Sequence, residues 1–452
     1  MRLAVERCLM GVVFLCAQMH PQTFGRCAAA MTTGLECRHA VERSRCGLPM
    51  RSVVTRLAVL LLLCMAMSCS RPSVTLTHDA YIWQREWTPA LTQAMHASAG
   101  DIRAWRVLAA QTDAGGRLQL FHPDRAALQA SGKPVVLVVR IDGQLAQWNE
   151  AQLLSDTEAL WRDWQANGLH ITALEIDHDC GTARLSAYAH YLAALRPLLR
   201  GASLSITALP AWLHAAALDD VLAQVDESVL QVHAVRDPHA GLFDGELARQ
   251  WAEAYAQRSD KPFRIALPTY GSRVSWDAQG RLASVQSESV ALDSGDDSRE
   301  LLATPQQVAA FLAQLRRDPP ANLAGIAWFR LPTAQDDRAW TLPTWLAVIR
   351  QQPLGNELVA VAQASTTPGM LDLLLRNPGE LDAPLPGRVT LPSSCTLADG
   401  INGYAKQSVQ GESNRDTLVL ERRQLGLLPA HRQRVIGWAR CAAQGVELHV
   451  DA

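Results

Sequence analysis

The sequence has no excess of basic residues. Its 42 Lys and Arg residues face 44 Asp and Glu residues, which leaves a formal net charge of −2 over 452 residues. Because binding to nucleic acid depends on a positively charged surface, we expect no nucleic-acid partner. Hydrophobic residues make up 48% of the chain, which is typical of a globular protein with a sizeable core.

Cysteine is scarce beyond the N-terminal region. Five of the ten cysteines lie before residue 50, two more are Cys64 and Cys69, and only Cys180, Cys395 and Cys441 follow. These three contain no C-x-x-C pair, so we predict no cysteine zinc site, no metal and no other cofactor. In an oxidising compartment Cys395 and Cys441 could pair and leave Cys180 free, but the sequence does not define their distance, so the pairing stays open.

The apolar run Leu57–Met67 is too short to span a membrane comfortably, since a spanning helix needs about 20 residues. It follows Arg51 and Arg56, as the apolar region of a secretory signal peptide follows basic residues. It leads into Ala66-Met67-Ser68-Cys69, which resembles the lipobox of bacterial lipoproteins, although a lipobox usually has Leu where Ala66 stands. The resemblance implies that Cys69 is lipidated and anchors the protein to a membrane of the cell envelope. Simple secretion into the periplasm is the alternative.

A second methionine, Met50, begins this signal peptide, which we place at residues 50–69. Residues 1–49 show no core-like pattern and hold five cysteines. We therefore expect residues 1–49 to be a non-native upstream leader that comes from an over-extended start site.

From residue 78 onward, strand-like and helix-like patterns alternate. The predicted strands cover residues 78–83, 105–110, 134–143, 171–176, 204–209, 229–235, 263–268 and 323–329, and a helical pattern follows each of them. Eight β–α repeats in about 275 residues predict an α/β fold, a (β/α)8 TIM barrel, over residues 70–352. The competing doubly wound sheet does not need eight strands, and the chain lacks a Gly-rich phosphate turn after its first strand.

The last hundred residues have a different character. Predicted strands over residues 358–364, 370–377, 388–391, 417–425 and 435–439 are separated by Pro, Gly and Asn turns. We predict a small C-terminal all-β, sandwich-like domain over residues 353–452, with residues 435–439 as its closing strand. A long polar excursion, residues 272–299, interrupts the barrel after its seventh strand.

The fourth predicted strand ends in three alternating carboxylates, Glu175, Asp177 and Asp179. Successive side chains of a strand point to opposite faces, so these three share one face. Stacked carboxylates repel one another, but a catalytic site uses such an arrangement to keep one acid protonated beside an ionised neighbour. The plainer alternative is a strand end in solvent with Asp179 capping the next helix, but Glu175 lies too far back for capping.

Other polar and aromatic residues lie at the C-terminal ends of the predicted strands, where barrel enzymes carry their sites. The candidate substrate-binding residues are Trp83, Asp142, His233, Tyr270, Trp328 and Arg330. Further residues at these ends are Asp79, Arg140, Pro210, Trp212, Arg236, Asp237 and Arg273. Each has an ordinary structural explanation, such as core packing for His233 and Trp328, but their shared placement favours a carbohydrate site.

The segments HDAYIWQREW, VVRIDG, EIDHDC and SITALPAWL resemble an uncharacterised bacterial family, domain of unknown function 3142, across the barrel. More distantly, the barrel resembles the family 18 glycoside hydrolases, the chitinase group. Glu175-Ile-Asp177-His-Asp179 takes the place of their strand-four D-x-D-x-E motif, and the segment from Ala266 to Gly271 is similar to their strand-seven motif. Gly325-Ile-Ala-Trp328 is similar to the strand-eight motif whose Trp lies under the sugar.

The resemblance implies substrate-assisted hydrolysis, with Asp179 as the general acid and Asp177 orienting the 2-acetamido group. Glu175 would tune Asp177, Trp328 would stack under the sugar and Tyr270 would line the site. The sequence departs from the family at two positions. Asp179 is one methylene shorter than the family's Glu, and His233 stands where the sixth strand usually supplies Tyr.

We therefore expect an envelope lipoprotein, similar to glycoside hydrolases, that acts on the glycosidic bonds of a polysaccharide or amino-sugar glycan. The alternative is a non-catalytic lipoprotein that binds glycan or takes part in envelope assembly. A metal-dependent hydrolase using Asp177, Asp179 and His233 is a third reading, but it needs more histidines at the strand ends.

Overall fold

The computed structural model describes residues 74–145, 149–233, 241–276, 282–286, 297–336, 339–410, 416–424, 426–442 and 448–451. The expected leader, the expected signal peptide and Cys69 lie outside these residues. Within the described part of the chain, no helix combines the length and the apolar character that crossing a membrane requires.

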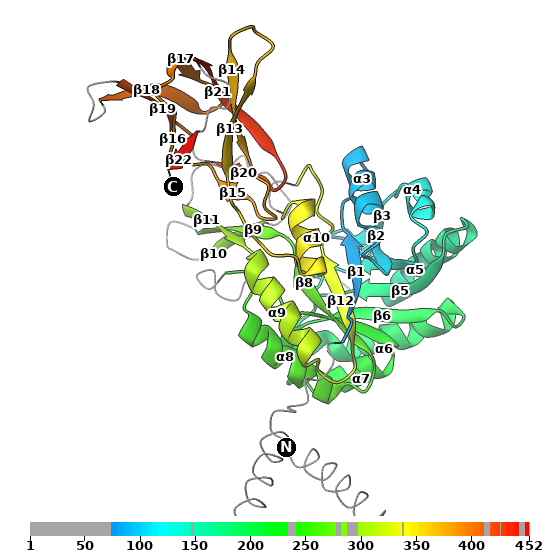
Figure 1. Cartoon of the computed structure of the whole chain (residues 1–452). Coiled ribbons are helices and arrows are strands. Elements are labelled where there is room, and N and C mark those ends of the chain that lie inside the picture. The colour runs from blue at the N-terminus through cyan, green and yellow to red at the C-terminus, as the bar shows by residue number, and fades with distance from the viewer. Residues whose placement is uncertain are drawn as a thin grey trace, which may run out of the picture. The chain divides into compact units, whose positions relative to one another are not determined.

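Eight parallel strands close into a barrel in the order β1-β12-β8-β7-β6-β5-β4-β2, and β2 pairs back with β1. They are β1 (Thr77–Ile82), β2 (Ala104–Thr112), β4 (Val135–Arg140), β5 (Ile171–Asp177), β6 (Ser203–Ala208), β7 (Glu227–Gln231), β8 (Phe263–Pro268) and β12 (Leu323–Phe329). Figure 1 shows the helices on the outside of this ring of strands. The predicted (β/α)8 barrel is confirmed.

A helix follows each barrel strand. The helices are α3 (Pro89–Ser98), α4 (Arg125–Ala130), α5 (Glu150–Ala166), α6 (Leu185–Leu195), α7 (Leu218–Ala223), α8 (Gly245–Arg258), α9 (Pro305–Arg317) and α10 (Leu342–Arg350). Local sequence explains their ends. Thr88 accepts a hydrogen bond from the Leu91 amide at the start of α3. Gly168 takes a φ of +71° just beyond α5, a conformation that costs glycine little.

Two predicted helices are shorter than expected. The pattern over residues 185–199 predicts one helix, but α6 ends at Leu195 and a 3₁₀ segment, Arg196–Leu199, follows. Pro197 explains the change, because proline lacks the amide hydrogen that an α-helix needs. The helix predicted over residues 212–224 is reduced to α7, Leu218–Ala223, and a 3₁₀ turn, Pro210–Trp212, precedes it.

The barrel strands are buried on both faces, and each face has its own core. Outward-facing strand residues, such as Trp105 and Trp328, pack against the helices in an outer core that also includes fully buried Trp212 and Trp345. Inward-facing residues form a separate cluster that includes Tyr81, Trp83, Leu108, Val138, Val229, Ala266 and Ala327. Since neighbouring residues of a strand face opposite sides, the residue number decides whether a side chain can reach the interior of the barrel.

Two smaller elements decorate the barrel. Strand β3 (Leu118–Leu120) pairs antiparallel with β2. The expected polar excursion contains a three-stranded antiparallel sheet of β9 (Gly271–Trp276), β10 (Leu282–Gln286) and β11 (Asp297–Leu302). Its strands are mostly polar and show no strict alternation of polar and apolar residues, so the sequence pattern did not identify them.

The C-terminal region is all-β, as predicted. Two antiparallel sheets, β13-β14-β21-β17 and β18-β19-β16-β22, contribute to one hydrophobic cluster that includes Leu373, Val389, Leu420 and Ile436. The strands are β13 (Val359–Ala364), β14 (Leu371–Arg376), β15 (Ala383–Pro384), β16 (Arg388–Thr390), β17 (Cys395–Gly400), β18 (Tyr404–Gln410), β19 (Asp416–Arg422), β20 (Leu427–Leu428), β21 (Gln433–Cys441) and β22 (His449–Asp451). Residues 435–439 do not close the domain, because β22 follows them.

A disulfide joins Cys395 and Cys441, which face each other on the paired strands β17 and β21. The remaining described cysteine, Cys180, is a buried free thiol. The structure therefore decides the pairing that the sequence leaves open.

Candidate active site

Three carboxylates of β5 and its C-terminal extension form the centre of the site. Glu175 and Asp177 lie in the barrel interior and are 0% and 2% exposed. Asp179 follows the end of β5, and 34% of its side chain is exposed. The stack therefore runs from the closed interior of the barrel to a carboxyl group that solvent reaches.

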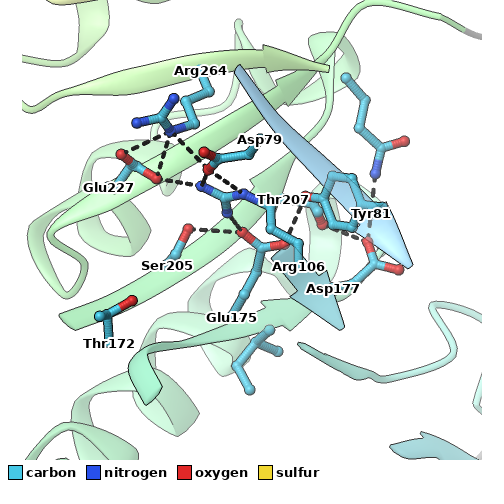
Figure 2. Close-up of polar contacts among 12 residues, drawn as sticks. Asp79, Tyr81, Arg106, Thr172, Glu175, Asp177, Ser205, Thr207, Glu227 and Arg264 are labelled. Carbon is cyan, nitrogen blue, oxygen red and sulfur yellow. Dashed lines mark hydrogen bonds and ion pairs between the residues drawn. The ribbon is translucent and has the colours of Figure 1, made fainter. Parts of the chain in front are cut away.

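Glu175 is held by three donors from three other strands (Figure 2). Its Oε1 accepts from the hydroxyl of Tyr81 at 2.6 Å, and its Oε2 accepts from the hydroxyl of Ser205 at 2.9 Å and from Nη1 of Arg106. Burial raises the pKa of Glu175, and the ion pair with Arg106 opposes that shift. These contacts fix Glu175 in place beneath Asp177.

A layer of buried charges lies around Glu175. Arg106 also contacts Asp79 and Glu227, and Arg264 pairs with the same two carboxylates (Figure 2). Arg103 binds Asp79 through two nitrogens, at 2.8 and 2.6 Å. The layer thus contains three guanidinium groups, of Arg103, Arg106 and Arg264, and three carboxylates, of Asp79, Glu175 and Glu227. The layer is therefore formally neutral, which is what the low dielectric of a barrel interior requires.

Asp79 belongs to this layer and is not a carboxylate at a strand end. It lies early in β1, is 0% exposed and is surrounded by guanidinium groups. Burial raises the pKa of Asp79, but Arg106 and Arg264 outweigh burial and leave that pKa below its usual value. Asp79 thus stays ionised and has no proton to donate at neutral pH.

Asp177 is buried but well satisfied. Thr207 donates to its Oδ1 at 2.7 Å, and Nη1 of Arg140 donates to its Oδ2 at 3.0 Å. The side-chain amide of Gln231 lies 3.5 Å from the same Oδ1. Donors on two sides therefore hold the Asp177 carboxyl group in one orientation next to Asp179.

Asp179 has looser contacts. The Gln231 amide donates to its Oδ1 at 3.1 Å, and Nη2 of Arg140 lies 3.8 Å from its Oδ2. Partial burial and the charge of Asp177 raise the pKa of Asp179 to about 7, although Arg140 and Gln231 oppose the shift. Near neutral pH, Asp179 can therefore hold a proton.

Aromatic side chains line the interior next to the carboxylates. Trp83 and Phe329 meet edge to face with 5.0 Å between their ring centroids, and Phe329 also meets Tyr81 at 5.6 Å and Tyr270 at 5.5 Å. The guanidinium group of Arg140 lies 5.6 Å from the Trp83 ring centroid. Both predicted residues, Trp83 and Tyr270, therefore lie next to the carboxylates in this aromatic group. Trp83 is buried there, with 3% of its surface exposed.

His233 joins this aromatic group. Its ring stacks on Phe329 at 5.7 Å, and its Nδ1 lies 3.3 Å from the Tyr270 hydroxyl. Burial lowers the pKa of His233 to about 4, so the imidazole is neutral at neutral pH. His233 is therefore a polar group on the site wall, as its position at a strand end predicts.

Trp328 does not face the site, which corrects the prediction that it stacks under a sugar. Its side chain is 0% exposed and points outward, where its Nε1 donates to Nδ1 of His78 at 3.0 Å. It also packs edge-on against Trp345 of α10. The next residue, Phe329, is the strand-eight aromatic that faces inward.

Among the described residues, neither Asp142 nor Arg330 contacts the three carboxylates. Asp142 is exposed and caps a turn by accepting from the Gln144 amide at 2.8 Å. Arg330 is paired with Asp336 at 2.6 Å, and its side chain is only 12% exposed. Among the other strand-end residues, Trp212 is buried in the outer core, and Arg236 and Asp237 lie outside the described residues.

The residues of the site that escaped sequence analysis include Tyr81, Arg106, Ser205, Thr207, Gln231 and Phe329. Arg106 carries a signal, because a lone charge in an otherwise apolar strand needs a buried partner of opposite charge. Within the ranges that the structure covers, the site included, no group of three or more His, Cys, Asp or Glu side chains is arranged to hold a metal ion.

Two family models match the sequence. Residues 131–334 match a family described as "Domain of unknown function (DUF3142)". The resemblance to family 3142 is confirmed. The DUF3142 match includes strands β4 to β12 and therefore all three carboxylates of β5. Residues 360–442, in the C-terminal region, match "Domain of unknown function (DUF8456)". No curated protein matches the chain in sequence.

Solved structures that are similar to this chain include a chitinase from Chromobacterium violaceum ATCC 12472, with 14% identity, a TM-score of 0.44, and coverage of 61% of this chain and 98% of that one. The spore cortex-lytic enzyme SleL from Bacillus megaterium QM B1551 has 11% identity, a TM-score of 0.45 and coverage of 63% and 76%. A chitinase from Bacteroides thetaiotaomicron has 12% identity, a TM-score of 0.42 and coverage of 57% and 90%. At these values the similarities say nothing about the substrate of this barrel.

Proposed function

We propose that the barrel is a glycoside hydrolase that acts on an amino-sugar glycan, with Asp179 as its general acid. The observation that carries the proposal is the asymmetry of two neighbouring carboxyl groups. Asp179 is partly exposed and has a pKa raised to about 7, whereas Asp177 is buried and held by Thr207 and Arg140. Glycoside hydrolysis needs one carboxyl group that donates a proton and one that remains an anion.

In the proposed reaction, Asp179 transfers its proton to the glycosidic oxygen while the bond between that oxygen and C1 breaks. The carbonyl oxygen of the substrate's own 2-acetamido group then bonds to C1, and Asp177 orients this group and stabilises its positive charge. Water, deprotonated by Asp179, attacks C1, releases the acetamido oxygen and restores the acid. The amino-sugar assignment rests on the resemblance of the β5 motif to family 18 enzymes.

The experiment compares fluorogenic N-acetylglucosaminides with the matching glucosides, which lack the acetamido group. We expect the purified protein to hydrolyse only the former, and the Asp179→Asn variant serves as the control for contaminating activity. Equal hydrolysis of the glucosides would contradict acetamido assistance. Saturable binding of an N-acetylglucosamine oligomer without turnover would instead establish a glycan-binding protein, which the shorter acid at position 179 favours as the second candidate.

The rate of hydrolysis should fall with rising pH. A general acid works only when it is protonated, and burial together with Asp177 raises the pKa of Asp179 to about 7. We therefore expect kcat/KM to decrease about tenfold per pH unit above pH 7. Because Arg140 lowers the pKa of Asp179, Arg140→Gln should move this decline to higher pH. A decline that stays in place or moves to lower pH in Arg140→Gln would contradict the assignment.

We further propose that the protein is a lipoprotein of the cell envelope, anchored through Cys69. The disulfide between Cys395 and Cys441 supports export, because disulfides persist in oxidising compartments. We expect the wild-type protein to fractionate with membranes and Cys69→Ala to lose the lipid mass and leave the membrane fraction. If the wild type carries no lipid mass and Cys69→Ala fractionates as the wild type does, the anchor is contradicted and simple secretion is favoured.

A further inference from the structure

The loop that follows β4 runs against the backbone of Asp179. A Cβ atom placed on Gly143 would lie 2.0 Å from the carbonyl oxygen of Asp179 and 2.5 Å from its carbonyl carbon. Both atoms belong to the main chain, so no side-chain rotation could relieve the overlap. Only glycine allows the two backbones to approach this closely.

The same loop is tied to the residues that precede Asp179. The Ile141 amide donates to the Asp177 carbonyl at 2.8 Å, and Nδ1 of His178 lies 3.0 Å from the Ile141 carbonyl oxygen. The His178 ring is 1% exposed and rests edge-on against Tyr188. The β4 loop thus contacts three consecutive residues, from Asp177 to Asp179.

The other side of Asp179 is also fixed. Nε1 of Trp212 donates to the carbonyl oxygen of Cys180 at 2.8 Å, and Trp212 is fully buried. Among the residues that the structure describes, the carboxyl group of Asp179 contacts Gln231 at 3.1 Å and Arg140 at 3.8 Å. The position of this carboxyl group therefore depends mainly on where the backbone is held.

We propose that Gly143 is a positioning residue for Asp179: its missing side chain lets the β4 loop hold the acid at its place above Asp177. The catalytic meaning of this inference rests on the proposed hydrolase function. A methyl group at position 143 must push the Asp179 backbone away from the loop. Displacing a reacting group by about 1 Å can cost on the order of 100-fold in rate.

The first test compares Gly143→Ala with Gly181→Ala. Gly181 lies two residues after Asp179, has a φ of −68°, and an added Cβ would meet no atom within 4 Å, so it is a matched control in the same segment. We expect Gly143→Ala to lower kcat on the order of 100-fold with little change in KM, and Gly181→Ala to behave like the wild type. Equal activity of both variants, or equal losses, would overturn the inference.

A second measurement does not depend on turnover. The carboxyl carbon of Asp179 can be titrated by NMR in the wild type and in both variants. Burial and Asp177 raise the pKa of Asp179 in the present arrangement. We expect Gly143→Ala to move it toward the ordinary Asp value and Gly181→Ala to leave it unchanged. The same titration in all three proteins would overturn the positioning role.

The two measurements separate the positioning role from the proposed function. If the wild type hydrolyses nothing but the titration shifts only in Gly143→Ala, the hydrolase proposal fails and the positioning role stands. If Gly143→Ala does not fold, His178→Phe replaces it, because that change keeps a ring against Tyr188 but removes the contact with the Ile141 carbonyl. An unchanged Asp179 titration in folded His178→Phe would then overturn the inference.

Discussion

Replacing Asp179 by Asn is expected to lower kcat by about two to four orders of magnitude and to leave binding of an N-acetylglucosamine oligomer largely intact. The amide has nearly the shape of the acid and can still meet the Gln231 side chain, but it has no proton to give to the leaving oxygen. Steady-state kinetics and calorimetric binding, measured on the same preparation, would separate the loss of catalysis from the loss of affinity.

Asp142→Asn is the matched control. Asp142 is an exposed carboxylate in the neighbouring loop, and its role is to cap a turn by accepting from the Gln144 amide, which an Asn oxygen also does. We expect this variant to keep wild-type kcat. In addition, the decline of rate above pH 7 should vanish in Asp179→Asn and persist in Asp142→Asn. Equal turnover by wild type and Asp179→Asn would exclude Asp179 as the acid.

The barrel could be predicted from the sequence because each of its units is visible locally. Strands buried on both faces give continuous apolar runs, such as residues 134–143, and the helices between them begin and end at recognisable residues such as Thr88 and Gly168. The sheet formed by β9, β10 and β11 could not be recognised in the same way. Its strands are mostly polar, so their pattern resembles a loop.

The three carboxylates were predictable because their arrangement follows from alternation along one strand. Glu175, Asp177 and Asp179 are two residues apart, so their shared face needs no knowledge of the fold. On β12, two aromatic residues are adjacent, and the sequence does not say which of Trp328 and Phe329 faces inward. Because neighbouring residues of a strand face opposite sides, an alignment that is off by one residue selects the wrong side chain. The motif resemblance selected Trp328, which faces outward, and not Phe329, which faces inward.

Contacts between strands depend on register, which the sequence does not contain. Arg106 and Glu175 are 69 positions apart, and Arg106 and Glu227 are 121 apart. Only the closed barrel brings these side chains to one level of its interior (Figure 2). The same register turns Asp79, which the sequence analysis places among the residues at strand ends, into a buried partner of three guanidinium groups.

Replacing Arg106 by Met is expected to destabilise the protein by about 3–5 kcal/mol, because it leaves buried carboxylates without their central cation. Arg106 is 0% exposed and contacts Asp79, Glu175 and Glu227, and the neighbouring Arg264 contacts only two of these. Glu175 depends on Arg106 most, because Arg106 is the only cation that forms an ion pair with Glu175 among the described residues. Urea unfolding followed by circular dichroism measures the change in unfolding free energy.

Two further variants make this result specific to the buried charge layer. Arg125 pairs with Asp163 on the surface, with 41% and 58% of their side chains exposed, so Arg125→Met should cost no more than about 1 kcal/mol. Adding Glu175→Gln to Arg106→Met restores the charge balance of the layer and should recover part of the lost stability. If the double variant is less stable than Arg106→Met, charge balance is not what Arg106 provides. Full recovery would identify Glu175 as the carboxylate that requires Arg106, and so connect the stability of the barrel to the lowest member of its carboxylate stack.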